Sequence, residues 1–506
     1  MAEYSTLAAV DLGSNSFHCQ VVRVVGDQIY PLDSLREPVR LGAGLTKDKR
    51  LDDASQERAL ACLKRFGERL RDFDHRAVRA VGTNTLRVAK NAGSFLRRAQ
   101  AALKFPIEVV AGREEARLIY LGVSHELPAS RDRRLVVDIG GGSTEFIIGA
   151  AYKPLKLESI FMGCVSYSTR FFPDGKVSKG AMKQAELAAR TELQPIVATF
   201  SQGNWQQAVG SSGTVRAIAD IMQQNGFDGG AITPDGVDRL RSYLIKQGAM
   251  DKVELAGLRP DRVPVFLGGV AIMNAVLSEL RIESMVAATG AMRQGVLYDL
   301  LGRFHHKDMR DVTVSQFMQR YHVDALQARR VGALALSLYG KLTADSGEPD
   351  DTPVQRITWA ARLHEIGISV AYSGYHKHSA YIINNADMPG FSNDEQLALS
   401  LLVLSHRRSL NKVAKRLEEH DVDWNTVFAL RLAALFHRSR ADVTAPNLQV
   451  RLHGRKLRLV VDSGWLERNP LTVTALADEV REWDKIGFEL KVPGLDELET
   501  GTELAA

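Results

Sequence analysis

Two short segments of this chain repeat one pattern of residues that could hold phosphate. Residues 11–18 read DLGSNSFH and residues 138–145 read DIGGGSTE, so each runs from aspartate through glycine to serine. Glycine lets backbone N–H groups gather round an anion, hydroxyls add donors, and an aspartate at a strand end can hold hydrated Mg²⁺. A single copy would indicate only a tight turn. Two copies facing each other would bind a phosphate from both sides, and we interpret them as a duplicated phosphate clamp.

Between the two segments lies a pair of acids that could activate water. Residues 109–120 read VVAGREEARLIY, a strand running into a helix whose first turn holds Glu114 and Glu115. Acids in a first helical turn also complement the helix dipole, so one of the pair needs no catalytic role. Since adjacent helical residues point about 100° apart, at most one can face a cleft squarely. Hydrolysis of a phosphoanhydride needs a base that accepts a proton from the attacking water. The glutamate that faces the cleft would be this base.

The elements around these segments predict two related α/β lobes. Residues 1–125 alternate strands and helices, with a hairpin at 7–25, strands at 77–81 and 107–110, and helices at 55–70 and 94–103. Residues 126–304 repeat the plan, with a second hairpin, a helix at 179–200 and a strand at 208–210.

The second half of the chain changes pattern twice. Residues 305–445 are almost wholly helical in pattern, with helices near 327–338, 354–365, 395–406 and 426–436. Residues 446–506 carry strand patterns around one helix at 473–482. We therefore predict four domains with boundaries 1–125, 126–304, 305–445 and 446–506: two α/β lobes, an all-α domain and a small α/β domain.

The distribution of charge indicates a polyanionic partner. The net charge of the 506 residues is +5, but residues 61–110 and 401–460 each carry a net +7 and residues 461–506 carry −7. A single basic stretch is usually a solvated face, whereas two in a chain with a phosphate clamp would concentrate a polyanion. Zinc-finger spacing and aromatic RNP-like strands are absent from the sequence, so specific nucleic-acid binding is not predicted.

The remaining composition favours a cytoplasmic protein. The three cysteines, Cys19, Cys62 and Cys164, are too far apart for a metal-ligand motif and too few for a disulfide framework. No apolar N-terminal segment and no run of about 18 uncharged apolar residues occurs in the sequence, so we expect no transmembrane segment, although peripheral membrane association stays open.

Six segments in order resemble one enzyme family. DLGSNSFH, VGTNTLR, GREEARLIYLGV, DIGGGSTE, GSSGT and ATGAMRQGVLYD are similar to the exopolyphosphatase and guanosine pentaphosphate phosphohydrolase family, and the resemblance extends over essentially the whole chain. It implies two ribonuclease H-like lobes of the actin, sugar kinase and acetate kinase superfamily, in the long, four-domain arrangement. It also suggests a homodimer.

The resemblance implies a role for individual residues. Glu115 matches the catalytic base, and Asp138 and Glu145 match acids associated with Mg²⁺, with a monovalent cation such as K⁺ as a further cofactor. The residues expected at phosphate are Asp11, Ser14, Asn15, Arg87, Gly140, Gly141, Ser143 and Thr144. By its chemistry alone, Arg87 could equally be a surface ion-pair partner.

The helical part resembles a degenerate HD phosphohydrolase domain. Such domains bind metal through a His-Asp doublet, but here the doublet is His364-Glu365, and the longer side chain would displace the carboxylate. We therefore expect no second active site there. An expected polyanion-binding surface comprises His378, His406, Arg407 and Arg408.

The predicted activity is exopolyphosphatase, the Mg²⁺-dependent and processive removal of terminal phosphate from inorganic polyphosphate. The first alternative is hydrolysis of guanosine pentaphosphate (pppGpp) to the tetraphosphate, which would link the protein to the stringent response. A second is a polyanion sensor that binds without turnover. A kinase of the same superfamily is disfavoured, because Glu115 suits water activation and no sugar-binding pattern is present.

Overall fold

The computed structural model describes residues 4–128, 130, 132–304, 308–344, 351–440, 446 and 448–495. Contacts divide the chain into two compact units, which are described separately. The first comprises Met1–Met309 together with Pro389–Asn393, and the second comprises Arg310–Met388 and Asp394–Ala506. The four predicted domains stay a prediction, and residues 305 and 445, at two of their boundaries, lie outside the described part.

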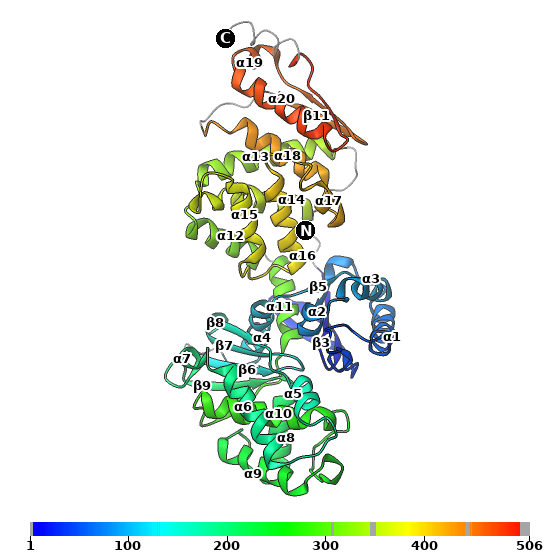
Figure 1. Cartoon of the computed structure of the whole chain (residues 1–506), viewed down its shortest axis with the longest axis vertical. Coiled ribbons are helices and arrows are strands. Elements are labelled where there is room, and N and C mark those ends of the chain that lie inside the picture. Colours follow the sequence, from blue (N-terminus) through cyan, green and yellow to red (C-terminus); the bar gives the residue numbers. More distant parts are fainter. Residues whose placement is uncertain are drawn as a thin grey trace. The chain divides into compact units, whose positions relative to one another are not determined.

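The first unit contains two five-stranded sheets with the same topology (Figure 1). The first sheet has the order β3-β2-β1-β4-β5 and the second has the order β8-β7-β6-β9-β10. The strands of the first are β1 (Thr6–Leu12), β2 (Phe17–Val25), β3 (Gln28–Glu37), β4 (Val78–Gly82) and β5 (Ile107–Val109). Those of the second are β6 (Arg134–Ile139), β7 (Thr144–Ala150), β8 (Lys153–Ile160), β9 (Gln207–Ser211) and β10 (Met285–Ala287).

Both sheets mix antiparallel and parallel pairs in the same way. β1 pairs antiparallel with β2 and parallel with β4, and β6 pairs antiparallel with β7 and parallel with β9. The two hairpins predicted from the glycine-rich segments are thus confirmed, and so is the prediction of two related lobes. β1 and β6 are apolar and buried along almost their whole length, as expected of strands with other elements over both faces.

Helices pack on both sheets of the first unit. In the first lobe they are α1 (Asp53–Leu70), α2 (Asn84–Val88), α3 (Ala92–Leu103) and α4 (Gly112–Glu126), with 3₁₀ helices at Leu41–Gly44 and His75–Ala77. In the second they are α5 (Cys164–Phe171), α6 (Lys179–Leu193), α7 (Val197–Phe200), α8 (Ser212–Gln224), α9 (Pro234–Gln247), α10 (Val263–Glu279) and α11 (Met292–Phe304), with a 3₁₀ helix at Met250–Lys252.

Local sequence explains where several of these helices begin and end. α1 begins after Asp52, whose carboxylate accepts a hydrogen bond from the Ser55 N–H at 2.6 Å. α9 begins with Pro234 and ends at Gln247, and the next residue, Gly248, caps it in the left-handed conformation with φ 77°. The single helix predicted at 179–200 is wrong: α6 ends at Leu193 and α7 begins at Val197, because Pro195 has no N–H to continue the ladder.

The second unit is helical and closes with a small sheet. Its helices are α12 (Met309–Arg320), α13 (Ala325–Leu342), α14 (Asp351–Leu363), α15 (Tyr375–Asn385), α16 (Asn393–Ser405), α17 (Ala414–Glu419), α18 (Trp424–Phe436), α19 (Ser463–Glu467) and α20 (Pro470–Asp484), with a 3₁₀ helix at Ile366–Ser369. The strands β11 (Gln449–His453), β12 (Lys456–Val460) and β13 (Glu489–Lys491) form a three-stranded sheet, and α20 precedes its last strand. No helix in the described ranges is both long and apolar enough to cross a membrane.

Candidate active site

The two clamp segments use glycine for the same structural reason. Each lies in a hairpin turn, between β1 and β2 or between β6 and β7. A Cβ atom on Gly13 would lie 2.9 Å from the Ser16 carbonyl oxygen, and one on Gly140 would lie 2.9 Å from the Ser143 carbonyl oxygen. A side chain at either position would therefore force the turn apart, which explains the glycine of the repeated pattern.

The two turns lie against each other. A Cβ on Gly141 would be 2.9 Å from the Ser14 Cβ and 3.2 Å from the Asn15 backbone nitrogen, and one on Gly142 would be 2.5 Å from the Asn84 amide oxygen. The predicted approach of the two segments is thus confirmed. They meet at the carboxyl ends of the parallel strands β1, β4, β6 and β9, the edge where open α/β sheets bind ligands.

Several buried polar atoms at this meeting point have no protein partner. They are Asp11 Oδ1, both amide atoms of Asn15, Ser16 Oγ and Asn84 Nδ2, each without a hydrogen bond in the part of the chain that the structure describes. Buried polar atoms are normally hydrogen-bonded, because leaving them unpaired costs free energy. A group of them between two glycine turns indicates a place for a polar ligand.

Four carboxyl groups converge on the same place. Burial, followed by the nearby Glu115 carboxylate, raises the pKa of Asp11 to about 7. Burial also raises the pKa of Asp138 to about 6 against an opposing hydrogen bond from Ser211, with Glu115 adding to the rise. The pKa of Glu145 is raised well above its usual value by burial and then by Glu115 and Asp138. Without a cation, these groups repel one another.

The hairpin register places two of these acids directly opposite each other. Asp138 pairs with Glu145 across β6 and β7, and the corresponding pair across β1 and β2 is Asp11 with His18. Like charges directly opposite on neighbouring strands are unfavourable. In the first lobe the problem does not arise, since burial and then Arg293 lower the pKa of His18 to about 3.

These residues fit a magnesium ion that substrate helps to hold. Among the described residues, no three His, Cys, Asp or Glu side chains form a group that could hold a metal by themselves. Mg²⁺ is usually bound by one or two carboxylates, with water and substrate phosphates as the remaining ligands. Asp138, Glu145 and the unpaired Asp11 Oδ1 can supply those carboxylates, so the donor set suits this mode of binding.

Glu115 is held by an arginine of the first lobe. Arg87, on α2, donates one N–H to Glu115 Oε2 at 2.6 Å and also contacts the Val110 carbonyl oxygen at 2.9 Å. Both side chains are largely buried, so the alternative of an exposed surface ion pair is wrong for Arg87. Glu115 in turn is close enough to influence the pKa of Asp11, Asp138 and Glu145. It therefore faces the clamp.

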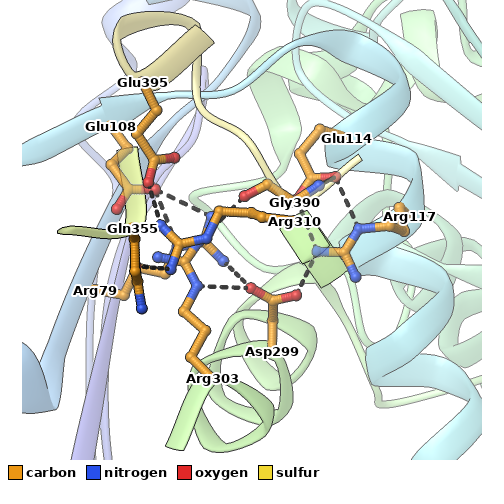
Figure 2. Close-up of polar contacts among 10 residues, drawn as sticks. All are labelled: Arg79, Glu108, Glu114, Arg117, Asp299, Arg303, Arg310, Gln355, Gly390 and Glu395. Carbon is orange, nitrogen blue, oxygen red and sulfur yellow. Dashed lines mark hydrogen bonds and ion pairs between the residues drawn. The ribbon is translucent and has the colours of Figure 1, made fainter. Parts of the chain in front are cut away.

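Its neighbour Glu114 points into a buried ion network instead (Figure 2). Its two oxygens accept hydrogen bonds from Arg117, both at 2.7 Å, and Oε2 also accepts one from the Gly390 N–H at 2.9 Å. Arg117 also donates a hydrogen bond to Asp299 Oδ1 at 2.5 Å, and Arg79 donates one to Asp299 Oδ2 at 2.6 Å. The sequence predicted one structural and one catalytic acid. The contacts of Glu114 fit the structural one, and they do more than complement the helix dipole.

The remaining predicted phosphate residues fall into two groups. Ser14 accepts a hydrogen bond from Thr85 at 2.8 Å, and Ser143 bonds to Glu145, so both belong to the clamp. Thr144 differs, because its hydroxyl donates to the Met162 carbonyl oxygen at 2.6 Å and its side chain is fully buried. Its hydroxyl donor is thus used within the fold, and a contact of Thr144 with phosphate stays a prediction.

Sequence reasoning missed a set of basic residues beside the clamp. Arg293 acts on the pKa of Asp11, and Arg216 acts on that of Asp138. The groups that lower the pKa of His18 include Arg36, Arg216, Arg262 and Arg293. Arg216 and Arg293 directly follow the GSSGTV and ATGAM sequences, but nothing in their spacing distinguishes them from solvent-facing arginines. Asn84 could have been found, since it lies inside the VGTNTLR segment.

In the second unit the predicted polyanion residues are not all on a surface. His406 is 2% exposed, Arg407 is half-buried, and Arg408 is exposed. In the His364-Glu365 doublet, Glu365 pairs with Arg440 at 2.5 Å and lies 3.8 Å from His364 Nε2. That this doublet forms no second active site stays a prediction. The polyanion surface therefore stays a prediction, with His406 inside rather than on it.

Comparison with known proteins places this geometry in a family. The model of the Ppx/GppA phosphatase family matches residues 20–304, and the model of Ppx/GppA phosphatase domain III matches residues 309–480. A crystal structure of an exopolyphosphatase from Cytophaga hutchinsonii ATCC 33406 is 26% identical with a TM-score of 0.53, and the match covers 59% of this chain and 98% of that one. A Ppx/GppA family member from Aquifex aeolicus is 23% identical with a TM-score of 0.50, covering 60% of this chain and 99% of that one.

Proposed function

The chain belongs to the Ppx/GppA phosphatase family, and we propose that it hydrolyses the terminal phosphoanhydride bond of inorganic polyphosphate and releases orthophosphate. The observation that carries this proposal is the position of Glu115 beside a clamp of unpaired polar atoms and three further acids. The similarity to an exopolyphosphatase of known structure supports the substrate. Water is the proposed acceptor, because the acid at the clamp suits removal of a proton from water.

In the proposed reaction the terminal phosphate lies between the two glycine turns. Backbone N–H groups near Gly13 and Gly140 and the side chains of Ser14, Asn15 and Ser143 bind its oxygens. Glu115 accepts a proton from a water molecule as the water oxygen attacks phosphorus. The bond from phosphorus to the bridging oxygen breaks, and the shortened chain leaves with that oxygen. Arg87 orients the Glu115 carboxylate through the 2.6 Å contact.

Mg²⁺ is the proposed cofactor, held by Asp138 and Glu145 with Asp11 nearby. When bound, the ion neutralises charge on the phosphate oxygens and on these acids. Arg216 and Arg293 add fixed positive charge on the same side and do not depend on metal. A monovalent cation such as K⁺ is a further proposed cofactor.

The test compares phosphate release from long polyphosphate and from pppGpp, each with and without Mg²⁺. We expect faster release from polyphosphate and dependence on Mg²⁺ for both. Faster release from pppGpp would favour the guanosine pentaphosphate phosphohydrolase, the other activity that the family name covers. Binding of polyphosphate without release of phosphate would favour the sensor.

Other properties of the protein are proposals of the same kind. Three buried free cysteines, Cys19, Cys62 and Cys164, are compatible with a reducing, cytoplasmic location. We propose a homodimer, processive hydrolysis and a contribution of Arg407 and Arg408 to binding long polyphosphate. Size determination in solution and the product distribution during hydrolysis test the first two.

A further inference from the structure

One carboxylate connects the two lobes of the first unit beside the phosphate clamp. Asp261, in the turn before α10 of the second lobe, accepts a hydrogen bond from Arg36 on β3 of the first lobe at 2.7 Å. It also accepts one from Arg259 at 3.1 Å and lies 4.0 Å from Arg262. The side chains of Asp261 and Arg36 are 20% and 26% exposed, so water still reaches this contact. A single acid thus lies against three arginines.

The strand register places Arg36 on the side of the clamp. Asp11 pairs with His18 across β1 and β2, and His18 pairs with Arg36 across β2 and β3. Because neighbouring strands lie about 4.8 Å apart, the backbone of Arg36 is about 10 Å from that of Asp11. Arg36 is therefore placed for a phosphate further along a chain whose end is held at Asp11, and not for the terminal phosphate itself.

Arg262 has the corresponding place in the second lobe. A Cβ atom on Gly213 would overlap the Arg262 guanidinium, so this group covers the first turn of α8. α8 directly follows β9, whose last residue, Ser211, pairs with Asp138 of the clamp. Arg36 and Arg262 thus lie beside the clamp on different lobes, and Asp261 is close to both.

Positive charge exceeds negative charge around Asp261. In the part of the chain that the structure describes, Arg36 and Arg262 form ion pairs with no other acid, and Arg216 and Arg293 form none. Burial lowers the pKa of Arg262, and Arg36 adds to this fall. Burial and then Arg216 lower the pKa of Arg293 in the same way. Repulsion among these cations favours an anion here, and Asp261 is the anion that the chain itself supplies.

The ion network of Figure 2 shows what a purely structural arrangement of arginines looks like in the same unit. Its three buried arginines of the first unit are matched by three acids, so that the charges balance. The arginines are Arg79, Arg117 and Arg303, and the acids are Glu108, Glu114 and Asp299. The cluster around Asp261 lacks this balance, which indicates that its arginines have a second, external anion as partner.

We propose that Asp261 is an internal counter-ion that a bound phosphate chain displaces from Arg36 and Arg262. The inference rests on the proposed function, because the displacing phosphate belongs to a chain whose terminal phosphate is held in the clamp. An arginine can bind two oxygens of one phosphate, so the chain competes effectively with the carboxylate. When a shortened chain moves or leaves, Asp261 pairs with the arginines again. Asp261 therefore sets the affinity for chains without affecting the affinity for a single orthophosphate.

The test compares steady-state hydrolysis of tripolyphosphate by the full-length parent protein and by its Asp261→Asn variant, with Mg²⁺ present. The KM for tripolyphosphate should fall about three- to tenfold, the value of a partly exposed ion pair, because substrate no longer competes with a carboxylate. The effect should appear in KM and not in kcat. The inhibition constant of orthophosphate should stay the same, since orthophosphate does not extend to Arg36. Asp261→Glu retains a carboxylate and should keep a KM close to that of the parent.

Two further variants complete the test. Asp251→Asn is the matched control, because Asp251 is exposed in the 3₁₀ helix Met250–Lys252 of the same lobe and its carboxylate forms no ion pair with a described residue. Arg36→Gln should raise the KM for tripolyphosphate. Asp261→Asn should lower KM less in the Arg36→Gln background than in the parent, since one of the two arginines that it releases is then missing.

An unchanged or higher KM for tripolyphosphate in Asp261→Asn would overturn the inference. An equal fall in the KM for tripolyphosphate and in the inhibition constant of orthophosphate would also overturn it, because Asp261 would then act on the clamp as a whole. In both cases the parent protein still releases phosphate, and the proposed function stands. If the parent releases no phosphate from tripolyphosphate or from long polyphosphate, the proposed function fails and this inference fails with it.

Discussion

Glu114→Gln should mainly lower stability and Glu115→Gln should mainly lower kcat, although the two residues are neighbours. Glu114→Gln removes one charge from a buried ion network in which Arg117 holds both carboxylate oxygens at 2.7 Å. Removing one partner of a buried ion pair typically costs about 3–5 kcal/mol. Because Asp299 still contacts Arg117 at 2.5 Å and glutamine can accept one hydrogen bond, we expect a lower cost of about 2–3 kcal/mol.

Glu115→Gln should lower stability by less than Glu114→Gln, because relief of repulsion among the clamp acids offsets the loss of the buried ion pair with Arg87. The substitution removes a negative charge that raises the pKa of Asp11, Asp138 and Glu145. It also removes the proposed base, so kcat should fall by about 10² to 10⁴ while substrate binding is retained. Glu114→Gln should retain most of its kcat, provided that the assay temperature keeps the protein folded.

Two measurements on the same preparations separate these outcomes. Steady-state phosphate release gives kcat, and hydrogen exchange of α4 amides gives local stability, where 2–3 kcal/mol corresponds to roughly 30- to 150-fold faster exchange. An inactive but stable Glu114→Gln protein together with an active Glu115→Gln protein would refute the assignment. So would equal losses of kcat in both variants, which would mean that the network rather than the base controls the rate.

Three further predictions concern charge at the clamp. Burial raises the pKa of Asp11 to about 7 and that of Asp138 to about 6, so protons compete with Mg²⁺ for these carboxylates. The Mg²⁺ concentration for half-maximal activity should therefore rise as pH falls from about 8 to about 5. A concentration that does not change with pH would contradict this. In the absence of metal, Asp11 stays protonated in the folded protein up to about pH 7, whereas in the unfolded chain it loses its proton above the ordinary pKa of 3.8. The free energy of unfolding should therefore fall as pH rises from about 4 to about 7. In denaturant titrations, Asp11→Asn should make the free energy of unfolding depend less on pH. The KM for long polyphosphate should rise more steeply with salt than the KM for tripolyphosphate, because a longer polyanion contacts more cations; parallel salt dependences would show that the basic stretches do not bind substrate.

Local residue patterns predicted the hairpins and most helices correctly. The repeated aspartate, glycine and serine spacing placed both turns, since Gly13 and Gly140 are required by the same close approach to a carbonyl oxygen. Helical geometry alone indicated that only one of Glu114 and Glu115 would face the clamp. These features depend on residues only a few positions apart, so local residue patterns are enough to predict them.

Long-range contacts were beyond prediction. Arg79 and Asp299 are 220 residues apart in the sequence and 2.6 Å apart in the fold, and no local signal pairs them. Arg216 and Arg293 resemble any other helical arginine until the fold brings them to the acids of the clamp. The hydrogen bond from the Thr144 hydroxyl to the Met162 carbonyl oxygen, 18 residues further along the chain, likewise has no local signal.

The most direct test of the central claim is hydrolysis of long-chain polyphosphate in ¹⁸O-labelled water with Mg²⁺ present and no acceptor added. If Glu115 activates water for attack on the terminal phosphorus, the labelled oxygen should appear in the released orthophosphate, the remaining chains should carry no label at their new ends, and Glu115→Gln should abolish most of the release. Labelled oxygen at the ends of the remaining chains, internal cleavage into shorter chains, or no release of orthophosphate without an acceptor would contradict the account.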